Sequence, residues 1–538
     1  MMIYGIIDND KFNCYSDYKS IDNDDYYITI DGYCDSNYLE CILDEYKDKK
    51  CDFIDNIKDF ISIYLYDKKS KELLIINDRI GAKKIYYCIR DNKLLFSNSL
   101  NKIVDNKDIN IEILSMYFRH HFIPEPYTIY KDIYKLEHGY YMTYKEDINK
   151  VNYYNIFDKF NNRITIDNYD ELEYELNNKL NKIIKELADN KENIGVYSSG
   201  GIDSNVVTSI FNKISSNNIN TFSIGYEEKE FDESSSSKII KNYLNTNHHE
   251  YIIKKEEALD IVKRIPDYYE EPFGDASAVS TLRLNEYAKK NDIRFALTGD
   301  GADQIFCGAS IYDTYYKIQK ASIINPLNIH LSNKLLKNKK LFYIFGNIPK
   351  KYKAQVDRIY KERKIGNLFA DLGPKRFEDE LNIKTNNLQE KKMILDLNTF
   401  QAQRVFPKMC IAAKKNNINI ISPFLTHEMI EFSFSIPHKY KYHKRIKKYI
   451  LKNVLYKYVP KSFFNDKKRG FTIPTVIWLN TCLNDDLKRV STKQFIKEQG
   501  IFNYNKIEYI INNIEDNANL VWDYYMFQIW YEKNILNK

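Results

Sequence analysis

The six residues from Ser199 to Ser204 have the types and the spacing of a phosphate-binding turn. They read Ser-Gly-Gly-Ile-Asp-Ser, follow a short apolar run and precede a stretch typical of a helix. Gly200 and Gly201 let the backbone approach an anion closely, and the amides and dipole of a helix N-terminus attract it. The hydroxyls of Ser199 and Ser204 add donors, and the Asp203 carboxylate is suited to hold Mg²⁺ against the same phosphates. The turn is therefore predicted to cradle a phosphate.

An ordinary solvated Gly-Ser turn would have the same six residues, because short motifs also occur by chance. The lysine of a Walker-type loop, G-x-x-x-x-G-K-S/T, is missing here. A different kind of nucleotide loop is therefore predicted.

The elements that must position this turn change character along the chain. Up to about residue 163, short alternating segments indicate strands at 2–7, 26–30, 60–66, 73–77, 84–88 and 93–96. A helical period begins at residue 170, and apolar runs at 193–197, 221–226, 250–253 and 294–298 then alternate with helical stretches. This alternation is typical of a parallel α/β sheet with ligands at the carboxyl ends of its strands. We predict an α+β domain of stacked antiparallel sheets at 1–165 and an α/β domain at 166–538, mostly helical beyond residue 309.

Further blocks strengthen the interpretation of the turn. They are TFSIGY at 221–226, FDE at 231–233, HHE at 248–250, EEPFGD at 270–275, TGDGAD at 298–303, SPFL at 422–425 and KRGFTIP at 468–474. The glycine turn resembles the pyrophosphate loop of N-type ATP pyrophosphatases, and the blocks together resemble the asparagine synthetase family, in the family's order. The resemblance implies an adenine nucleotide α-hydrolase-like second domain and an Ntn-hydrolase-like first domain.

Composition bounds the alternatives. A chain of 538 residues with 43% hydrophobic residues can bury two cores, and no apolar run has the length of a membrane span. No signal peptide is recognised, and eight cysteines without a CxxC pair suit a reducing cytoplasm. A formal net charge of +6, spread among interspersed acids, does not favour nucleic acid as a partner.

The first domain resembles the glutaminase half of this family, for example in DRIGAKKIYY at 78–87. The family opens Met-Cys-Gly-Ile, and its cysteine is the nucleophile, whereas Met2 stands here and a thioether forms no thiolate. An Arg-Gly-Pro-Asp stretch is not found, and the family's Asn-Gly-Glu is reduced to Asp31-Gly32-Tyr33. Cys14 is the nearest thiol, but loss of a single methionine cannot make it the first residue. We expect this domain to survive as a structural partner of the second.

The resemblance implies that a substrate carboxylate attacks the α-phosphate of ATP and that a nitrogen nucleophile then displaces AMP. Asp203 and Glu271 match the family's metal-binding acids and would hold Mg²⁺ across the phosphates. Lys468, or its neighbour Lys467, would stabilise charge on the α-phosphate and on the tetrahedral oxyanion. Nucleotide contacts are also expected from the blocks that contain Ser223 and Gly299.

The base for the incoming amine is predicted from the family's spacing. Counting back from Glu271 leads to Tyr268, which resembles the tyrosine of the β-lactam synthetase branch. A phenol has a pKa of about 10 and needs a charged neighbour to work near neutrality, and Asp303 is the candidate. The usual following glutamate is Gln304, and a packing role for Tyr268 is the alternative.

Several positions near the SPFL block depart from the family. Charged residues are replaced by Asn419, Ile421 and Thr426, and an Asp-Arg pair upstream is replaced by Cys410-Ile411, although Lys408 remains. Charged ligands need paired partners when they are desolvated, so a pocket for a larger or less charged acid than aspartate is expected.

Three functions follow. The leading hypothesis is an AMP-forming amide ligase that joins a small-molecule or peptide carboxylate to an amine other than glutamine-derived ammonia. The product would include intramolecular amides, as in β-lactam synthetases or lasso-peptide cyclases. An asparagine synthetase that uses free ammonia is the first alternative, and a non-catalytic scaffold is the second. A pathway protein or a second copy of the chain is the expected protein partner.

Overall fold

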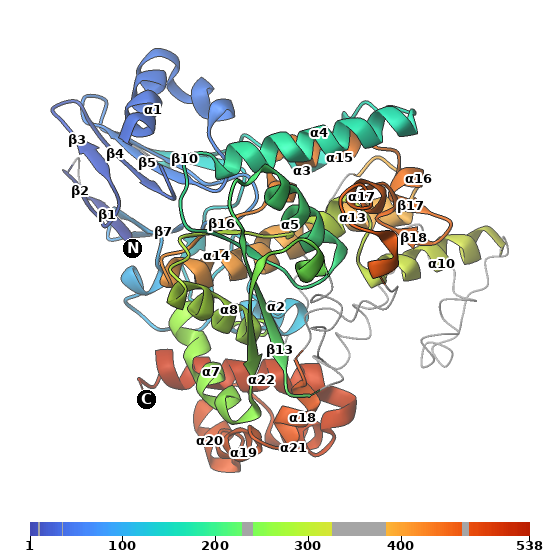
Figure 1. Ribbon diagram of the computed structural model, residues 1–538. Coiled ribbons are helices and arrows are strands. Elements are labelled where there is room, and N and C mark those ends of the chain that lie inside the picture. The colour runs from blue at the N-terminus through green and yellow to red at the C-terminus, as the bar shows by residue number, and fades with distance from the viewer. Residues whose placement is uncertain (9–10, 35, 229–239, 325–382, 465–472, 538) are drawn as a thin grey trace.

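The computed structural model describes residues 1–8, 11–34, 36–228, 240–324, 383–464 and 473–537 (Figure 1). Its first part contains two antiparallel sheets, drawn in blue in Figure 1. One sheet has the order β2-β1-β8-β7-β9, and the other has the order β11-β10-β6-β5-β4-β3. The strand bounds are β1 (Ile3–Asp8), β2 (Lys11–Ser16), β3 (Ser20–Asp22), β4 (Tyr26–Asp31), β5 (Ser62–Asp67), β6 (Glu72–Ile76), β7 (Tyr86–Arg90), β8 (Lys93–Ser97), β9 (Tyr134–Lys135), β10 (Tyr140–Tyr144) and β11 (Ile148–Asn152).

The two sheets pack face to face. Tyr64 and Tyr66 of β5 point into the core that both sheets share, together with Phe96 of β8. Side chains alternate along a strand, so Ile63 and Leu65 lie on the opposite face, where α1 (Ser36–Lys49) covers them. The outer face of the other sheet packs against α2 (Ile111–His120) and helices from the end of the chain. The predicted stacked antiparallel sheets are confirmed.

The second part is built on a parallel sheet of order β14-β13-β12-β15-β16. Its strands are β12 (Ile194–Tyr197), β13 (Asn220–Tyr226), β14 (Asn247–Ile253), β15 (Phe295–Leu297) and β16 (Asn419–Ile421). The helices that pack on it include α4 (Tyr169–Ala188), α5 (Ile202–Ile214), α7 (Lys255–Tyr268), α8 (Ala278–Lys290) and α14 (Phe406–Lys415). Four of these strands and α4 lie where the sequence predicted them.

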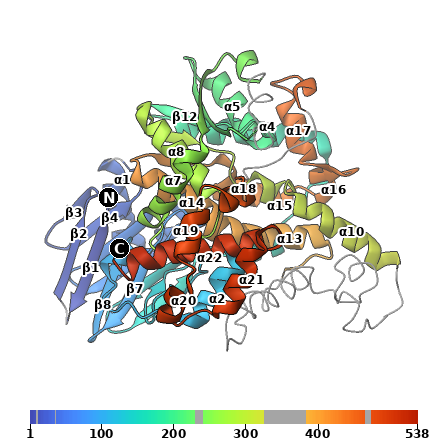
Figure 2. The same cartoon turned by 90° about the horizontal axis from the view of Figure 1, so that it is seen from below.

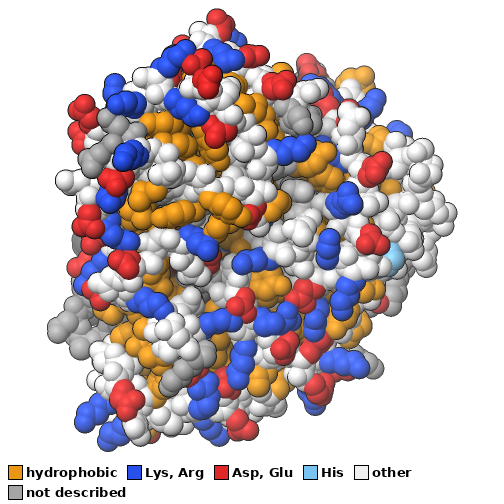
Figure 3. Space-filling view, turned by 90° about the vertical axis from the view of Figure 1, so that its left-hand side faces the viewer, with side chains coloured by type: hydrophobic (Ala, Val, Ile, Leu, Met, Phe, Trp, Pro, Cys, Tyr) orange, Lys and Arg blue, Asp and Glu red, His pale blue; other side chains and the backbone are white. Residues whose placement is uncertain are grey.

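Most of the remaining described chain is helical. It contains α3 (Ile156–Asn161), α9 (Ala302–Ile305), α10 (Ser310–Ile324), α13 (Leu388–Asp396), the π-helix η4 (Leu397–Val405), α15 (His427–Ser435), α16 (His438–Lys441), α17 (Tyr449–Leu455), α18 (Thr475–Asn480), α19 (Asn484–Arg489), α20 (Lys493–Gln499), α21 (Tyr504–Asn512) and α22 (Ile514–Asn534). The predicted boundary at residue 165 falls between α3 and α4, and α3 already contacts α13 and α15. Within the described residues, none of the helices has the length and apolarity needed to cross a membrane. Basic and acidic side chains are interspersed over the face shown in Figure 3.

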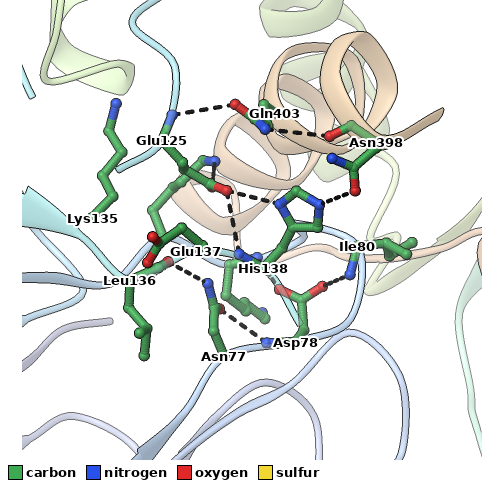
Figure 4. A network of polar contacts seen from close by, with 12 residues as sticks. Asn77, Asp78, Ile80, Glu125, Lys135, Leu136, Glu137, His138, Asn398 and Gln403 are labelled. Atoms are coloured by element: carbon green, nitrogen blue, oxygen red, sulfur yellow. Dashed lines mark hydrogen bonds and ion pairs between the residues drawn. The ribbon is translucent and has the colours of Figure 1, made fainter. Parts of the chain in front are cut away.

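A buried polar network joins the two parts of the chain (Figure 4). His138 contacts Glu125 through Nδ1 at 2.8 Å and Asn398 of η4 through Nε2 at 3.1 Å. Lys84 pairs with the other oxygen of Glu125 at 2.7 Å, and the backbone amide of Glu125 donates to Gln403 of η4. The π-helix is therefore joined to the first domain by buried and partly buried polar side chains.

This network gives a pH-dependent contribution to stability. Burial lowers the pKa of His138, but the Glu125 carboxylate outweighs burial and raises it above its ordinary value. A raised folded-state pKa means that the stabilisation is fully present below about pH 6.5 and is lost as pH rises through the folded-state value. We predict that His138→Gln lowers the free energy of unfolding by about 1–3 kcal/mol at pH 6 and by less at pH 9. Thermal unfolding of both proteins across this range measures the difference, and an equal deficit at both pH values would contradict the account.

Candidate active site

A cavity of about 700 Å³ opens at the carboxyl ends of β12 and β15 and beside β13. This is the edge at which parallel α/β sheets bind ligands. The cavity is lined by residues from the turn after β12, from β13, from the turn after β15, from the segment before α8 and from η4. Those used below are His121, Ser199, Asp203, Ser204, Ser223, Gly274, Asp275, Ser277, Gly299, Asp300, Asp303, Arg404 and Lys408.

The predicted phosphate turn has the backbone that its sequence requires. Gly200 has a φ of +79°, in the left-handed region that favours glycine, and Gly201 is the N-cap of α5. Asn205 donates through Nδ2 to the Gly200 carbonyl at 2.8 Å, and Ser204 donates through Oγ to the Gly201 carbonyl at 3.1 Å. These contacts hold the turn against the first turn of a 13-residue helix, whose N-terminal amides have no partner within the helix.

Gly299 packs directly against this turn. A Cβ at residue 299 would lie 2.8 Å from the Cβ of Asp203 and 2.8 Å from the backbone nitrogen of Ser204, which is too close. We predict that Gly299→Ala displaces the turn and weakens MgATP binding at least about tenfold, which is about 1.4 kcal/mol. The rise in melting temperature that MgATP causes reports this affinity. An unchanged rise in Gly299→Ala would show that the close packing has no role.

A buried lysine links two carboxylates at the cavity. Lys448 lies 2.5 Å from Oδ2 of Asp203 through its Nζ and also pairs with Asp303. Only 4% of the Lys448 side chain is exposed. Asp300 lines the cavity nearby, and its burial raises its pKa, with a further rise from the negative charges of Asp203 and Asp303.

These acids fit a magnesium ion that binds together with phosphates. Among the described residues, no three acidic, histidine or cysteine side chains converge to form a complete metal site. Mg²⁺ is usually held by one or two carboxylates plus substrate phosphates. Asp203 stands beside the phosphate turn, and the buried Oδ2 atom of Asp300 has no hydrogen-bond partner among the residues that the structure describes. The donor set therefore suits this mode of binding.

A second ionic group forms another wall of the cavity. Asp275 lies 3.3 Å from Nε of Arg404 and 3.4 Å from Nζ of Lys408. Burial alone would raise the pKa of Asp275, but the two cations, Lys408 first, hold it below its usual range. Ser277 donates to Asp275 through Oγ at 2.7 Å. This wall is charged, and its charges are paired.

The structure brings together most of the residues predicted to bind nucleotide. Ser199, Asp203, Ser204, Ser223, Gly299 and Asp303 line the cavity, and Gly200 with Gly201 forms its turn. Lys467 and Lys468 lie outside the described residues. Five further residues at the site were not expected from the sequence: His121, Asp275, Asp300, Arg404 and Lys448. Of these, Asp275 and Asp300 lie in the matched blocks.

Glu271 does not reach the cavity, so the structure does not support it as a partner of Asp203. Its carboxylate lies 2.5 Å from Lys135 and accepts from the Ile129 backbone amide at 2.9 Å. The neighbouring Glu270 likewise accepts from Ser99. The chain crosses the domain interface here, so the two glutamates face the first domain and Asp275, a few residues later, faces the cavity.

Tyr268 and Asp303 do not form the predicted pair. The Tyr268 hydroxyl donates to Glu286 at 3.1 Å, and Tyr268 is not among the cavity residues. Burial and the Glu286 charge raise the pKa of Tyr268, whereas a base that works near neutrality needs a lowered one. Tyr268 lies at the end of α7 and packs against the C-terminal helices, which is the packing alternative.

Four of the positions behind the substrate prediction lie at a different cavity, whereas Lys408 lines the nucleotide cavity. Asn419, Ile421, Thr426 and Cys410 line a space of about 510 Å³ between the two domains. The uncharged residues at these positions therefore belong to the domain interface. They do not line the nucleotide cavity, so they give no support to the prediction of a larger or less charged acid.

An ion cluster occupies the wall of this interdomain cavity. Asp31, which replaces the first residue of the family's Asn-Gly-Glu, is buried and lies 3.3 Å from Lys83 and 2.9 Å from Lys414. The Tyr18 hydroxyl donates to the same carboxylate at 2.6 Å. Burial raises the pKa of Cys14 to about 11, so its thiolate is scarce near neutrality.

Comparisons with known proteins agree with this architecture. A family model described as asparagine synthase matches residues 175–532, and one described as a glutamine amidotransferase domain matches residues 31–155. The putative glutamine-hydrolysing asparagine synthetase 2 of Methanocaldococcus jannaschii is 30% identical over 280 residues, which is 49% of this chain and 53% of that protein. The match thus spans about half of that relative's length.

Two relatives match over most of the chain. The glutamine-hydrolysing asparagine synthetase 1 of Bacillus subtilis is 23% identical over 523 residues, which is 92% of this chain and 81% of that protein. The amidase chry2 of Gibberella zeae is 21% identical over 564 residues, which is 93% of this chain and 81% of that protein.

Proposed function

We propose that this protein uses ATP to form amides and does not use glutamine as the nitrogen source. The chain belongs to the asparagine synthase family and is a carbon–nitrogen ligase of that kind. It would join a carboxylate to an amine that is supplied directly and release AMP and pyrophosphate. The observation that carries the proposal is a contrast between the two cavities. The nucleotide cavity keeps its phosphate turn and its carboxylates. At the interdomain cavity, Asp31 stands where the family has the asparagine of Asn-Gly-Glu, and its carboxylate is paired with Lys83 and Lys414.

The nucleotide cavity supports the first half-reaction. The substrate carboxylate would attack the α-phosphorus of ATP, and the bond to the pyrophosphate would break. The amides of the turn and the hydroxyls of Ser199 and Ser204 would hold the departing phosphates. Asp203 and Asp300 would hold Mg²⁺, which neutralises the charge that develops on the pyrophosphate. Lys448, and Lys468 as the family's block implies, would add positive charge there.

The first domain supports independence from glutamine. A buried carboxylate paired with two lysines and a tyrosine is costly to disrupt, because removing one partner leaves uncompensated charge. The thiol of Cys410 also lines the interdomain cavity, and burial raises its pKa well above its ordinary value. A thiol with a raised pKa is not an activated nucleophile, so Cys410 does not replace the family's cysteine.

The class of amine is the finer part of the proposal. The intramolecular form was inferred from Tyr268, which is not at the cavity, so an amine from a separate molecule is favoured. An asparagine synthetase that uses free ammonia is the second candidate, supported by the match to the Bacillus subtilis enzyme over 92% of this chain. A cytoplasmic location and a pathway protein or second copy as partner stay predictions.

A pyrophosphate-release screen tests the proposal. The full chain is given ATP, Mg²⁺, a panel of amino-acid and peptide carboxylates including aspartate, and either ammonium or a primary amine. Release that depends on the carboxylate, with AMP in equal amount, supports the ligase. Asparagine from aspartate and ammonium establishes the second candidate, and ADP in place of AMP overturns the mechanism.

A further inference from the structure

The nucleotide cavity contains a histidine from the first domain that is paired with a buried aspartate. His121 lines the cavity and is the C-cap of α2, with a φ of +68°. Its Nδ1 atom lies 2.6 Å from Oδ1 of Asp523 on α22, and 21% of the His121 side chain and 1% of the Asp523 side chain are exposed. Helices α2 and α22 lie side by side in Figure 2 and contact each other.

Neighbouring residues fix this pair in place. The Gly274 amide donates to the His121 carbonyl at 2.8 Å, and Arg404 donates to the carbonyl of His120 at 3.0 Å. A Cβ at residue 274 would lie 2.2 Å from Oδ1 of Asp523, so glycine is needed for the carboxylate to stand where it does. The Tyr117 hydroxyl donates to the Asp523 carbonyl at 2.8 Å. The pair is therefore built into the junction of three segments.

The aspartate determines what the imidazole can do. A carboxylate accepts hydrogen bonds, so Nδ1 carries the ring proton in the neutral form, and Nε2 is then the atom that can accept a proton. The same relation between a buried carboxylate and an imidazole orients general bases in hydrolases. Among the described residues, charged groups that interact with the pair include Asp275, before α8, and Arg404, on η4.

We propose that His121 is the general base of the second half-reaction and that Asp523 is its positioning residue. This assignment rests on the function proposed above. The lone pair of the amine nitrogen attacks the acyl carbon of the adenylate, and the proton leaves the nitrogen for Nε2 of His121. The bond from the acyl carbon to the phosphate oxygen breaks, and its electron pair leaves with AMP. The imidazolium then returns its proton to water.

His121→Asn is the sharpest variant. Asparagine tolerates the left-handed backbone and can donate its amide to Asp523 from nearly the same place, but it cannot accept the proton. His120→Asn is the matched control, because His120 ends the same helix and does not line the cavity. Each protein is given ATP, Mg²⁺ and the best carboxylate of the screen, with either a primary amine or hydroxylamine. Hydroxylamine is largely unprotonated at neutral pH and needs less help from a base.

The assignment predicts that His121→Asn keeps the pyrophosphate release of the first turnover and keeps hydroxamate formation, but loses about 100-fold or more in amide formation from the primary amine. Equal activity of variant and wild type with both nucleophiles overturns the assignment. Parallel loss of hydroxamate and pyrophosphate would also overturn it, in favour of a structural role. A wild-type protein that forms neither product overturns the proposed function and the assignment together.

Discussion

Asp203→Asn is expected to remove nearly all pyrophosphate release. The carboxylate stands at the second position of α5, beside the phosphate turn, and asparagine would keep its shape while removing its charge. Loss of the carboxylate that would hold Mg²⁺ against the departing phosphates costs about 100-fold or more in rate, or about 2.7 kcal/mol. The rise in melting temperature caused by MgATP should fall with it, which needs no knowledge of the acid substrate.

The matched control is Asp167→Asn, which removes an exposed carboxylate paired with Lys439 in the same domain. Exposed ion pairs contribute little, so this protein should respond to MgATP as the wild type does. If Asp203→Asn kept the wild-type response to MgATP, Asp203 would have no part in holding the nucleotide.

Gly81→Ala is expected to destabilise the domain interface severely. Gly81 has a φ of +76°, and a Cβ there would lie 1.8 Å from the carbonyl oxygen of Ala402 in η4. Left-handed backbone costs an alanine roughly 1–2 kcal/mol, and the clash with a backbone atom of a packed helix adds to it. We expect a loss of at least about 3 kcal/mol in the free energy of unfolding, because neither backbone can move without disturbing the buried network around His138.

Gly500→Ala separates the cost of the left-handed backbone from the cost of the steric clash. Gly500 has a φ of +69°, and among the described residues other than its chain neighbours no atom lies within 4 Å of the position that a Cβ would take. It therefore carries only the backbone cost, roughly 1–2 kcal/mol. Thermal unfolding of both variants measures the difference, and equal losses would show that the contact between Gly81 and η4 is not tight.

Local patterns in the sequence were sufficient to predict the two kinds of sheet. Alternation along residues 60–66 and the helical period from residue 170 are set by which side each residue presents to its own core. The structure confirms both as β5 and α4. Strand β16 escaped because it lies far along the chain from β15, the neighbour on which it depends for its hydrogen bonds.

The part of the site that comes from one continuous segment could be predicted from the sequence. The part built by segments that are far apart along the chain could not. The turn from Ser199 to Ser204 is local, so its residue types revealed it. His121 and Arg404 reach the cavity from α2 and η4, far apart along the chain, and neither lies in a recognisable motif. Glu271 was assigned from its match to a family block, and Tyr268 by counting back from Glu271. Neither a match nor a count says which side of a turn faces the cavity.

Glutamate release from glutamine tests the central claim most directly. The full chain is incubated with glutamine, ATP, Mg²⁺ and the carboxylate panel, and glutamate is measured beside AMP. The account predicts AMP formation that depends on an added amine or ammonium, with glutamate no higher than in a reaction without protein. Glutamate formed in proportion to AMP, with glutamine as the sole nitrogen source, would contradict it.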